Sequence, residues 1–271
     1  MLPFSFKLFL AKKDRRLRFL LPPDKAFICE HYLGNLRVNI NTIYPIEVEM
    51  LTGAYDPKTS AIIRRFVSVN DVVIDVGANV GALTLLMATV ANQGKVIAIE
   101  PGPPICSRLR NNLKLNPDIQ KTVDVYQIGL SDRAGELLWQ EDPNVVGNAG
   151  LLHHGGEPVK VDTLDNVVKN SGIERLDFIK IDVEGMEYEV IKGGLASITQ
   201  YRPFIYYETL EPFRAIRGFD LYGQIYAVLQ EMGYQHFCVL ANGEIESVSN
   251  LQVLRSPNTL AIPKEKVDRV V

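Results

Sequence analysis

The chain has few cysteines, no long hydrophobic run and no excess of positive charge. Its three cysteines, Cys29, Cys106 and Cys238, lie far apart without a C-x-x-C pair, so the sequence suggests neither a disulfide framework nor a zinc site. No apolar stretch approaches the roughly 20 residues that cross a bilayer. With 29 Lys and Arg against 32 Asp and Glu, no global positive field is available to hold nucleic-acid phosphates. These absences argue against an integral membrane protein and a nucleic-acid partner, and they favour a cytoplasmic location.

The first twenty residues are the one strongly basic segment. An apolar part with Phe4, Leu8 and Phe9 precedes a cluster of cations, the reverse of the order in a secretory signal, so we expect these residues in the mature protein. The cations are Lys12, Lys13, Arg15, Arg16 and Arg18. We favour a helix that packs on its own domain with a solvated basic face. The alternative is a peripheral contact with an anionic membrane or an acidic substrate.

From residue 70 onward, short apolar runs alternate with amphipathic stretches, as in parallel strands joined by helices. We predict an α/β domain over residues 59–271 and an N-terminal extension over residues 1–58 that packs on it. Glycines and prolines break residues 131–160 into an insertion that shapes a pocket. The expected strands are 72–76, 95–100, 123–130, 177–183 and 203–209, followed by an antiparallel pair, 234–240 and 251–262, at one sheet edge. The expected helices include 105–115, 187–192 and one that Asp56 caps and Pro57 begins.

The most informative segment, Asp75-Val76-Gly77-Ala78-Asn79-Val80-Gly81, leaves a buried strand and enters a helix. Its backbone passes close to whatever binds at the end of the strand, and Gly77 and Gly81 allow that approach. A dinucleotide fingerprint requires glycine where Asn79 stands, so NAD is disfavoured. Asp75 suits a ligand that carries positive charge.

Two further acids follow neighbouring strands. Glu100 ends the next strand, 25 positions after Asp75, where a carboxylate accepts both hydroxyls of a ribose. Asp132 follows the third strand and is a candidate acceptor for an adenine amino group, or else a turn residue. An acid, a glycine turn and a ribose-binding acid together describe a site for S-adenosylmethionine. On this interpretation Asp75→Ala or Glu100→Ala abolishes cofactor binding and leaves the fold intact.

The order of these motifs resembles the FkbM family of class I S-adenosylmethionine-dependent methyltransferases. The resemblance covers about residues 45–210 and is carried by VIDVGANVG, IAIEPGP, GLSDRAG, VDTLDN, DFIKIDVEGMEYEVIKGG and RPFIYYE. It implies a Rossmann-like, mostly parallel seven-stranded sheet with helices on both faces and the cofactor over the ends of the first three strands. It also implies O-methylation, commonly of sugar hydroxyls in glycans, glycolipids or glycosylated natural products, with S-adenosylhomocysteine as the product.

Acidic residues gather at the ends of the fourth and fifth predicted strands. Lys180 shares a strand face with Asp182 and, being buried, needs an acid partner, either Asp182 or Asp75. Asp182, Glu184 and Glu208 converge beside the reactive methyl. Either Asp182 or Glu184 takes the proton of an acceptor hydroxyl, which we favour, or Asp182 and Glu208 hold a Mg²⁺ that acidifies it. Mg²⁺ is therefore possible but not indicated.

Other candidates rest on weaker patterns. His153 and His154 lie in the insertion, from which a base could reach the acceptor, and His154 is the candidate. The alternative is that both histidines are exposed loop residues. Tyr55 and Glu49 precede the core and are candidates for the methionine end of the cofactor or for the core. Trp139, Tyr206 and Tyr207 are candidates for stacking on a sugar ring, although strand aromatics usually pack in the core.

Three functions fit the sequence. The first is O-methyl transfer to a sugar or another small hydroxyl-bearing acceptor. The second is N-methylation of a small-molecule amine, although the turn after the fourth strand, Asp182-Val183-Glu184-Gly185, lacks the Pro-Pro pattern typical of nucleic-acid amino methylases. The third is a scaffold that binds the cofactor without turnover. The acceptor and the oligomeric state do not follow from the sequence.

Overall fold

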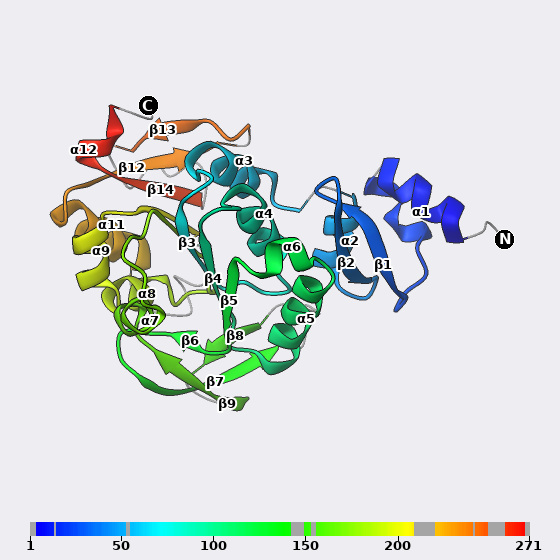
Figure 1. Ribbon diagram of the computed structural model, residues 1–271, viewed down its shortest axis with the longest axis horizontal. Helices are drawn as coiled ribbons and strands as arrows, with labels where there is room; N and C mark the ends of the chain where they lie inside the picture. The colour runs from blue at the N-terminus through cyan, green and yellow to red at the C-terminus, as the bar shows by residue number, and fades with distance from the viewer. Residues whose placement is uncertain are drawn as a thin grey trace.

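An eight-stranded sheet forms the centre of the computed structural model, which describes residues 4–13, 15–52, 55–141, 149–152, 156–208, 220–240, 242–248 and 258–268 (Figure 1). Five strands run parallel in the order β11, β10, β3, β4, β5. Their bounds are Phe204–Glu208, Phe178–Ile181, Val72–Val76, Lys95–Ile99 and Val123–Tyr126. The predicted mostly parallel sheet is confirmed, and each of these strands begins within one residue of its predicted start.

The other edge of the sheet is antiparallel. β14 (Asn258–Pro263) pairs antiparallel with both β11 and β12 (Tyr234–Val239), which confirms the predicted antiparallel pair over the described residues. A short strand that the sequence analysis did not predict, β13 (Ile245–Ser247), adds an eighth strand beyond the expected seven.

Alternating side chains of the strands face two separate cores. Val73 and Val96 join the core under one set of helices, whereas Ile74 and Ile97 join the core under the other. The first set is α3 (Pro57–Phe66), α4 (Ala82–Val90), α5 (Pro103–Lys114) and α6 (Pro117–Gln120). The second is α7 (Leu164–Ser171), α8 (Glu187–Lys192), α9 (Leu195–Tyr201) and α11 (Leu221–Glu231), and α12 (Lys264–Val267) follows β14. This is the two-faced packing that an α/β sheet requires.

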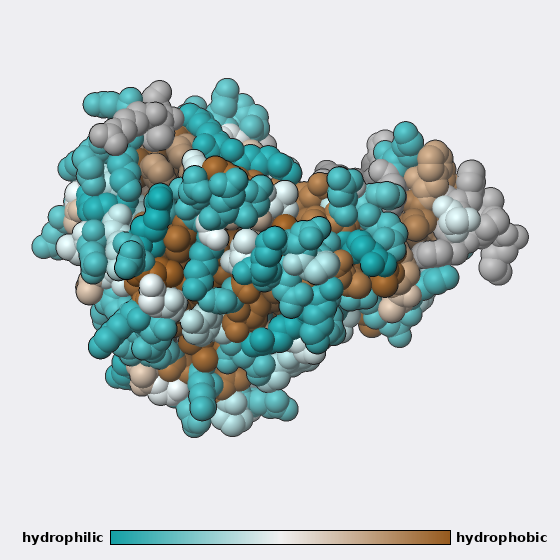
Figure 2. All heavy atoms as spheres, in the orientation of Figure 1, coloured by the Kyte–Doolittle hydropathy of each residue, from teal (hydrophilic) through white to brown (hydrophobic). Residues whose placement is uncertain are grey.

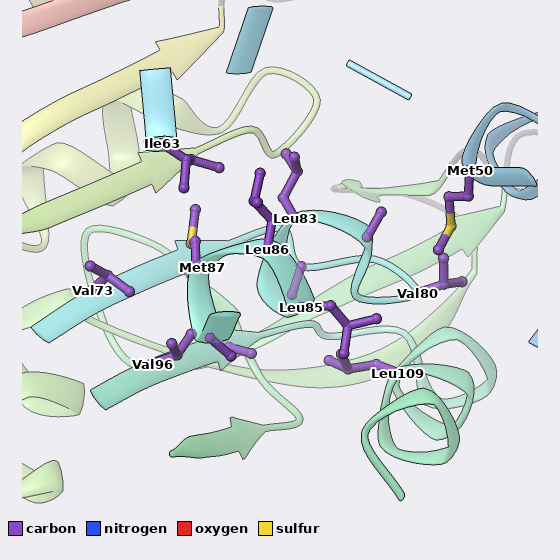
Figure 3. Close-up of a cluster of buried hydrophobic side chains, with 14 of the residues drawn as sticks. Met50, Ile63, Val73, Val80, Leu83, Leu85, Leu86, Met87, Val96 and Leu109 are labelled. Carbon is purple, nitrogen blue, oxygen red and sulfur yellow. The ribbon is translucent and has the colours of Figure 1, made fainter. Parts of the chain in front are cut away.

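Helix α4 lies between the sheet and its neighbouring helices. Figure 3 shows Leu86 and Met87 of α4 close to Ile63 of α3, with Val73 of β3 on the sheet side. All four side chains are fully buried. As predicted, Asp56 accepts a hydrogen bond from the Thr59 amide at 3.0 Å and caps α3. The cap fixes the start of α3 at Pro57.

The predicted strand 123–130 is wrong as a single element. It divides into β5 and a two-residue strand, β6 (Gly129–Leu130), which belongs to a second sheet in the order β6, β9, β7, β8. The other members are β7 (Gly135–Glu141), β8 (Ala149–Leu152) and β9 (Glu157–Asp162). The break at residues 127–128 follows because β6 pairs in parallel with β9 instead of continuing beside β4.

The N-terminal residues form a small unit of their own. A helix, α1 (Phe4–Lys13), and a 3-10 turn, η1 (Arg15–Leu20), precede a hairpin of β1 (Ala26–Tyr32) and β2 (Leu36–Asn41) and the helix α2 (Pro45–Thr52). The Tyr32 hydroxyl donates to the Ala82 carbonyl at 3.0 Å, and Met50 points toward Val80 (Figure 3). Figure 1 shows α1 at the far end of this unit. Over the residues that the structure describes, no helix has the length and apolar character needed to cross a bilayer.

Candidate active site

A pocket opens at the carboxyl ends of β3, β4 and β10, the edge at which open α/β sheets bind ligands. It brings together six predicted residues, which are Tyr55, Gly77, Asn79, Glu100, Asp182 and Glu184. They come from the segment before α3, the turn after β3, the end of β4 and the turn after β10. Parallel strand ends thus gather side chains that lie more than a hundred positions apart in the sequence.

The turn after β3 has the backbone that the motif predicts. Gly77, Asn79 and Gly81 all have positive φ angles, of 78°, 49° and 91°. Packing also requires glycine at positions 77 and 81. A Cβ on Gly77 would lie 1.9 Å from the Asp182 carbonyl oxygen, and one on Gly81 would lie 2.4 Å from a Leu109 methyl carbon. Gly77 is therefore needed for the close approach of β3 to the turn after β10, beside any need of a ligand.

Glu100 is fixed at the end of β4. Its two carboxylate oxygens accept the Asn79 amide at 3.0 Å and the Gly102 amide at 2.9 Å. Burial raises the pKa of this carboxyl to about 7, although both hydrogen bonds act in the opposite direction. Each oxygen keeps a further lone pair, so Glu100 can accept from a ligand in the pocket that it lines.

Asp75 lies beneath the turn and not among the residues that line the pocket. It is fully buried, accepts the Thr84 hydroxyl at 2.6 Å and forms an ion pair with the Lys180 ammonium at 3.2 Å. Lys180 also pairs with Asp182 at 3.5 Å and donates to the Gly77 carbonyl at 2.9 Å. The predicted acid partners of Lys180 are thus both confirmed. Asp75 acts on the turn through Lys180, so the structure does not give it the direct ligand contact that the sequence suggested.

Four carboxyl groups surround the turn after β10. Burial, and then the neighbouring carboxylates of Asp182 and Glu208, raise the pKa of Glu184 to about 8. Burial and Asp182 likewise raise the pKa of Glu208 to about 7. Glu187 accepts the Val183 and Gly185 amides, which holds the turn, and burial raises its pKa to about 7. The predicted convergence of Asp182, Glu184 and Glu208 therefore has an electrostatic signature.

Tyr55 faces the same charges. Burial raises its pKa, and so does the Asp182 carboxylate, which keeps its hydroxyl protonated and able to donate. Among the residues that the structure describes, no group of three or more His, Cys, Asp or Glu side chains is arranged to hold a metal ion.

Several predicted residues lie elsewhere. Asp132 forms an ion pair with Lys192 at 3.2 Å and does not line the pocket. Glu49 pairs with Arg18 at 3.4 Å. His153 and His154 lie outside the described residues.

The predicted aromatic candidates divide into two groups. Tyr206 and Tyr207 are core residues, with hydroxyls 2.6 Å from Thr59 Oγ1 and 3.1 Å from His236 Nδ1, so the stacking role suggested for them is wrong. Trp139 of β7 lines the pocket beside Glu100 and Pro101, and its ring packs over Gly102. The insertion therefore closes the Glu100 end of the pocket with an aromatic side chain.

Sequence reasoning missed three contributors to this site. Glu187 carries a weak signal, because an acid in the first turn of a helix often binds nearby backbone amides. Thr84 and Ile46 carry no such signal, because their roles depend on which segments the fold places beside them. Thr84 donates a hydrogen bond to Asp75, and Ile46 lines the pocket.

The sequence is similar to those of known methyltransferases. The family model "Methyltransferase FkbM domain" matches residues 75–236. Methyltransferase sdnD of Sordaria araneosa is 33% identical over 198 residues, which cover 61% of this chain and 74% of sdnD. Hexuronic acid methyltransferase AglP of Haloferax volcanii is 33% identical over 125 residues, covering 46% and 50%. The 2-O-methyltransferase NoeI of Sinorhizobium fredii is 27% identical over 201 residues, covering 62% and 80%. Because the family match spans more than half of its residues, the chain belongs to the FkbM methyltransferase family and is an S-adenosylmethionine-dependent methyltransferase.

Proposed function

We propose that this enzyme transfers a methyl group to a hydroxyl of a sugar, in a glycan, a glycolipid or a glycosylated natural product. The observation that carries the proposal is the pair of acids, Asp182 and Glu184, that lines the same pocket as Glu100 and Trp139. A hydroxyl acceptor must lose a proton during transfer, so it needs a base at this position. The names of AglP and NoeI, a hexuronic acid methyltransferase and a 2-O-methyltransferase, support the same choice.

The pocket residues fit the cofactor of the family. Glu100 would hold the ribose hydroxyls, since amides fix its carboxylate and its free lone pairs remain available. Trp139 and Leu130 would enclose the adenine, and Tyr55 would hold the methionine end. The bound cofactor supplies an electrophilic methyl group on a sulfonium. Asp132 has a place in this proposal only if its ion pair with Lys192 opens.

We assign the general base to Glu184. A base works best when its pKa lies near the working pH, and the pKa of about 8 for Glu184 meets that condition. Asp182 is paired to Lys180 and thereby orients the turn, while Glu208 raises the pKa of Glu184 through its charge. The proton of the acceptor hydroxyl would pass to the Glu184 carboxylate. The proposal uses no Mg²⁺.

Turnover with matched variants tests this assignment. The purified enzyme is given S-adenosylmethionine and a panel of sugars and amines, and S-adenosylhomocysteine and the methylated product are measured by mass spectrometry. We expect a sugar product from the wild type. Glu184→Gln should bind S-adenosylhomocysteine normally and lose at least about a hundredfold in kcat, the typical contribution of a general base. The control Glu174→Gln makes the same change at an exposed position.

Three outcomes would contradict the proposal. Methylation of amines alone would move the activity to N-methyl transfer. Cofactor binding without turnover across the panel would favour the scaffold. Full activity in Glu184→Gln would move the base to Asp182, whose Asp182→Asn variant is the next to measure, or to His154.

The N-terminal unit supports a second, separate proposal, a peripheral contact with an anionic membrane. Phe9 and Phe19 are 53% and 77% exposed, and Lys13 lies over the Phe9 ring at 5.8 Å. Aromatic rings beside cations suit the interface of an anionic bilayer. Flotation with phosphatidylserine vesicles should recover the protein, and Phe19→Ser should reduce the recovery more than Val69→Ser, which changes a 40% exposed residue on the main domain. Equal loss in the two variants would contradict this contact.

A further inference from the structure

A second cleft adjoins the active site between the N-terminal unit and α3. Its walls are the end of β1 and the turn that follows it, the end of α2 and the outer face of α3. Figure 2 shows the surface hollowed between these two parts of the molecule. Tyr55 lines both this cleft and the cofactor pocket, so the two spaces meet at its side chain.

The acidic cluster lies beyond one end of the cleft, and Arg64 lines the other end. Asp56, next to Tyr55, acts electrostatically on Glu208 and so lies near the acidic cluster. Farther along α3, Arg64 lines the cleft together with His31 of β1. Arg64 lies seven positions after Pro57 in the same helix, which corresponds to about 10 Å along the axis. An acceptor whose hydroxyl lies at the acids would therefore reach Arg64 with another part of its structure.

Arg64 has no acidic counterpart in the walls of the cleft. Among the described residues that line it, none is Asp or Glu. Arg64 and His31 are both exposed, and the structure shows no ion pair for either within its described residues. Burial raises the pKa of the Tyr32 hydroxyl, and Arg64 lies close enough for its charge to act in the opposite direction. That hydroxyl donates to the backbone of α4 and so holds this wall of the cleft in place. Ser60 of α3 adds a neutral hydrogen-bonding group between the two ends.

We propose that this cleft binds the acceptor and selects one with an anionic group, a carboxylate or a phosphate, which Arg64 and His31 hold away from the hydroxyl that is methylated. The inference rests on the proposed function, since it assumes that the acceptor hydroxyl lies at Glu184. Guanidinium groups bind carboxylate and phosphate through paired hydrogen bonds, which gives both affinity and orientation. The acids at the other end disfavour the reversed pose, because they would repel the anionic group.

Three disaccharides of one skeleton test the selection. Cellobiose, cellobiouronic acid and cellobiose phosphorylated at the same carbon are titrated into the enzyme loaded with S-adenosylhomocysteine, and binding is followed by saturation-transfer NMR. We expect at least one anionic member to bind about tenfold more tightly than cellobiose, the effect of one charge-assisted hydrogen bond. The tighter of the two anionic members identifies the source as carboxylate or phosphate.

Two variants on the same helix locate the effect. Arg64→Gln should remove the preference for the anionic member and leave the affinity for S-adenosylhomocysteine unchanged. Arg65→Gln, whose guanidinium lies over the Phe66 ring at 5.0 Å and outside the cleft, should retain the preference. Equal binding of all three disaccharides, binding of none, or equal effects of the two variants would overturn the inference. Failure of the wild type to bind S-adenosylhomocysteine would instead contradict the proposed function.

Discussion

Loss of the buried ion pair between Asp75 and Lys180 should destabilise the fold. The Asp75 side chain is 0% exposed and that of Lys180 is 4% exposed, and their charged atoms are 3.2 Å apart. Asp75→Asn keeps the shape and an oxygen for the Thr84 hydroxyl but removes the charge. Breaking a buried pair from one side costs about 3–5 kcal/mol of unfolding free energy. Because Lys180 retains Asp182 and the Gly77 carbonyl, we expect a loss near the lower limit, about 3 kcal/mol.

The coupling between the two residues can be measured directly. A loss of about 3 kcal/mol in a chain of this size lowers Tm by about 6–12 °C. Urea unfolding, followed by the fluorescence of Trp139, the single tryptophan, gives the free energies of Asp75→Asn, Lys180→Met and the double variant. We expect the double variant to lose less than the sum of the two single losses, since neither of the two buried positions, 75 and 180, then carries an unpaired charge. Additive losses, or a loss below about 1 kcal/mol in Asp75→Asn, would refute this account of the pair.

Two further predictions concern the pocket. Since burial places the pKa of Glu100 at about 7 and a ribose donates to the ionised form, affinity for S-adenosylhomocysteine should fall about fivefold as the pH falls from 7 to 6. Glu100→Gln should bind weakly with no such slope, and an unchanged slope in calorimetry would remove Glu100 from the site. Gly77→Ala should unfold at a lower temperature than the wild type, by more than Gly172→Ala, because both glycines have positive φ but only Gly77 faces a backbone atom. Equal decreases in the unfolding temperature of the two variants would show that the backbone near Gly77 relieves the clash without loss of stability.

The local parts of the site could be predicted from the sequence. The strand, glycine turn and helix at residues 72–90 follow from patterns within one segment, and so does the position of Glu100 at a strand end. The acids after the fourth and fifth strands meet because parallel strands end at one edge. For these residues the topology alone was sufficient.

The side chains whose roles differ from expectation depend on distant partners. Asp75 does not line the pocket, and the register of β3 and β10 places it beside Lys180. Asp132 pairs with Lys192, sixty positions away. Neither contact leaves a periodic pattern in the sequence. From the sequence alone, each acid is therefore equally consistent with an ion pair and with a ligand contact.

The acceptor side was the least predictable part. The β1–β2 hairpin has no strong signal, and long-range hydrogen bonds hold it in place, among them those of Tyr32 to α4 and of Asn39 to Asn112 of α5. The division of residues 123–130 into two strands likewise depends on β9, which follows thirty residues later. Features of this kind require the folded arrangement, and they are also the features that carry the proposed selection of an anionic acceptor.

Calorimetric titration of the purified enzyme with S-adenosylhomocysteine and, separately, with NAD tests the central claim most directly. We expect binding of S-adenosylhomocysteine with a dissociation constant on the order of micromolar, which corresponds to about −8 kcal/mol, and no detectable binding of NAD. A folded protein that binds NAD, or that binds neither compound, would contradict the assignment of Glu100 and the turn after β3 to the cofactor.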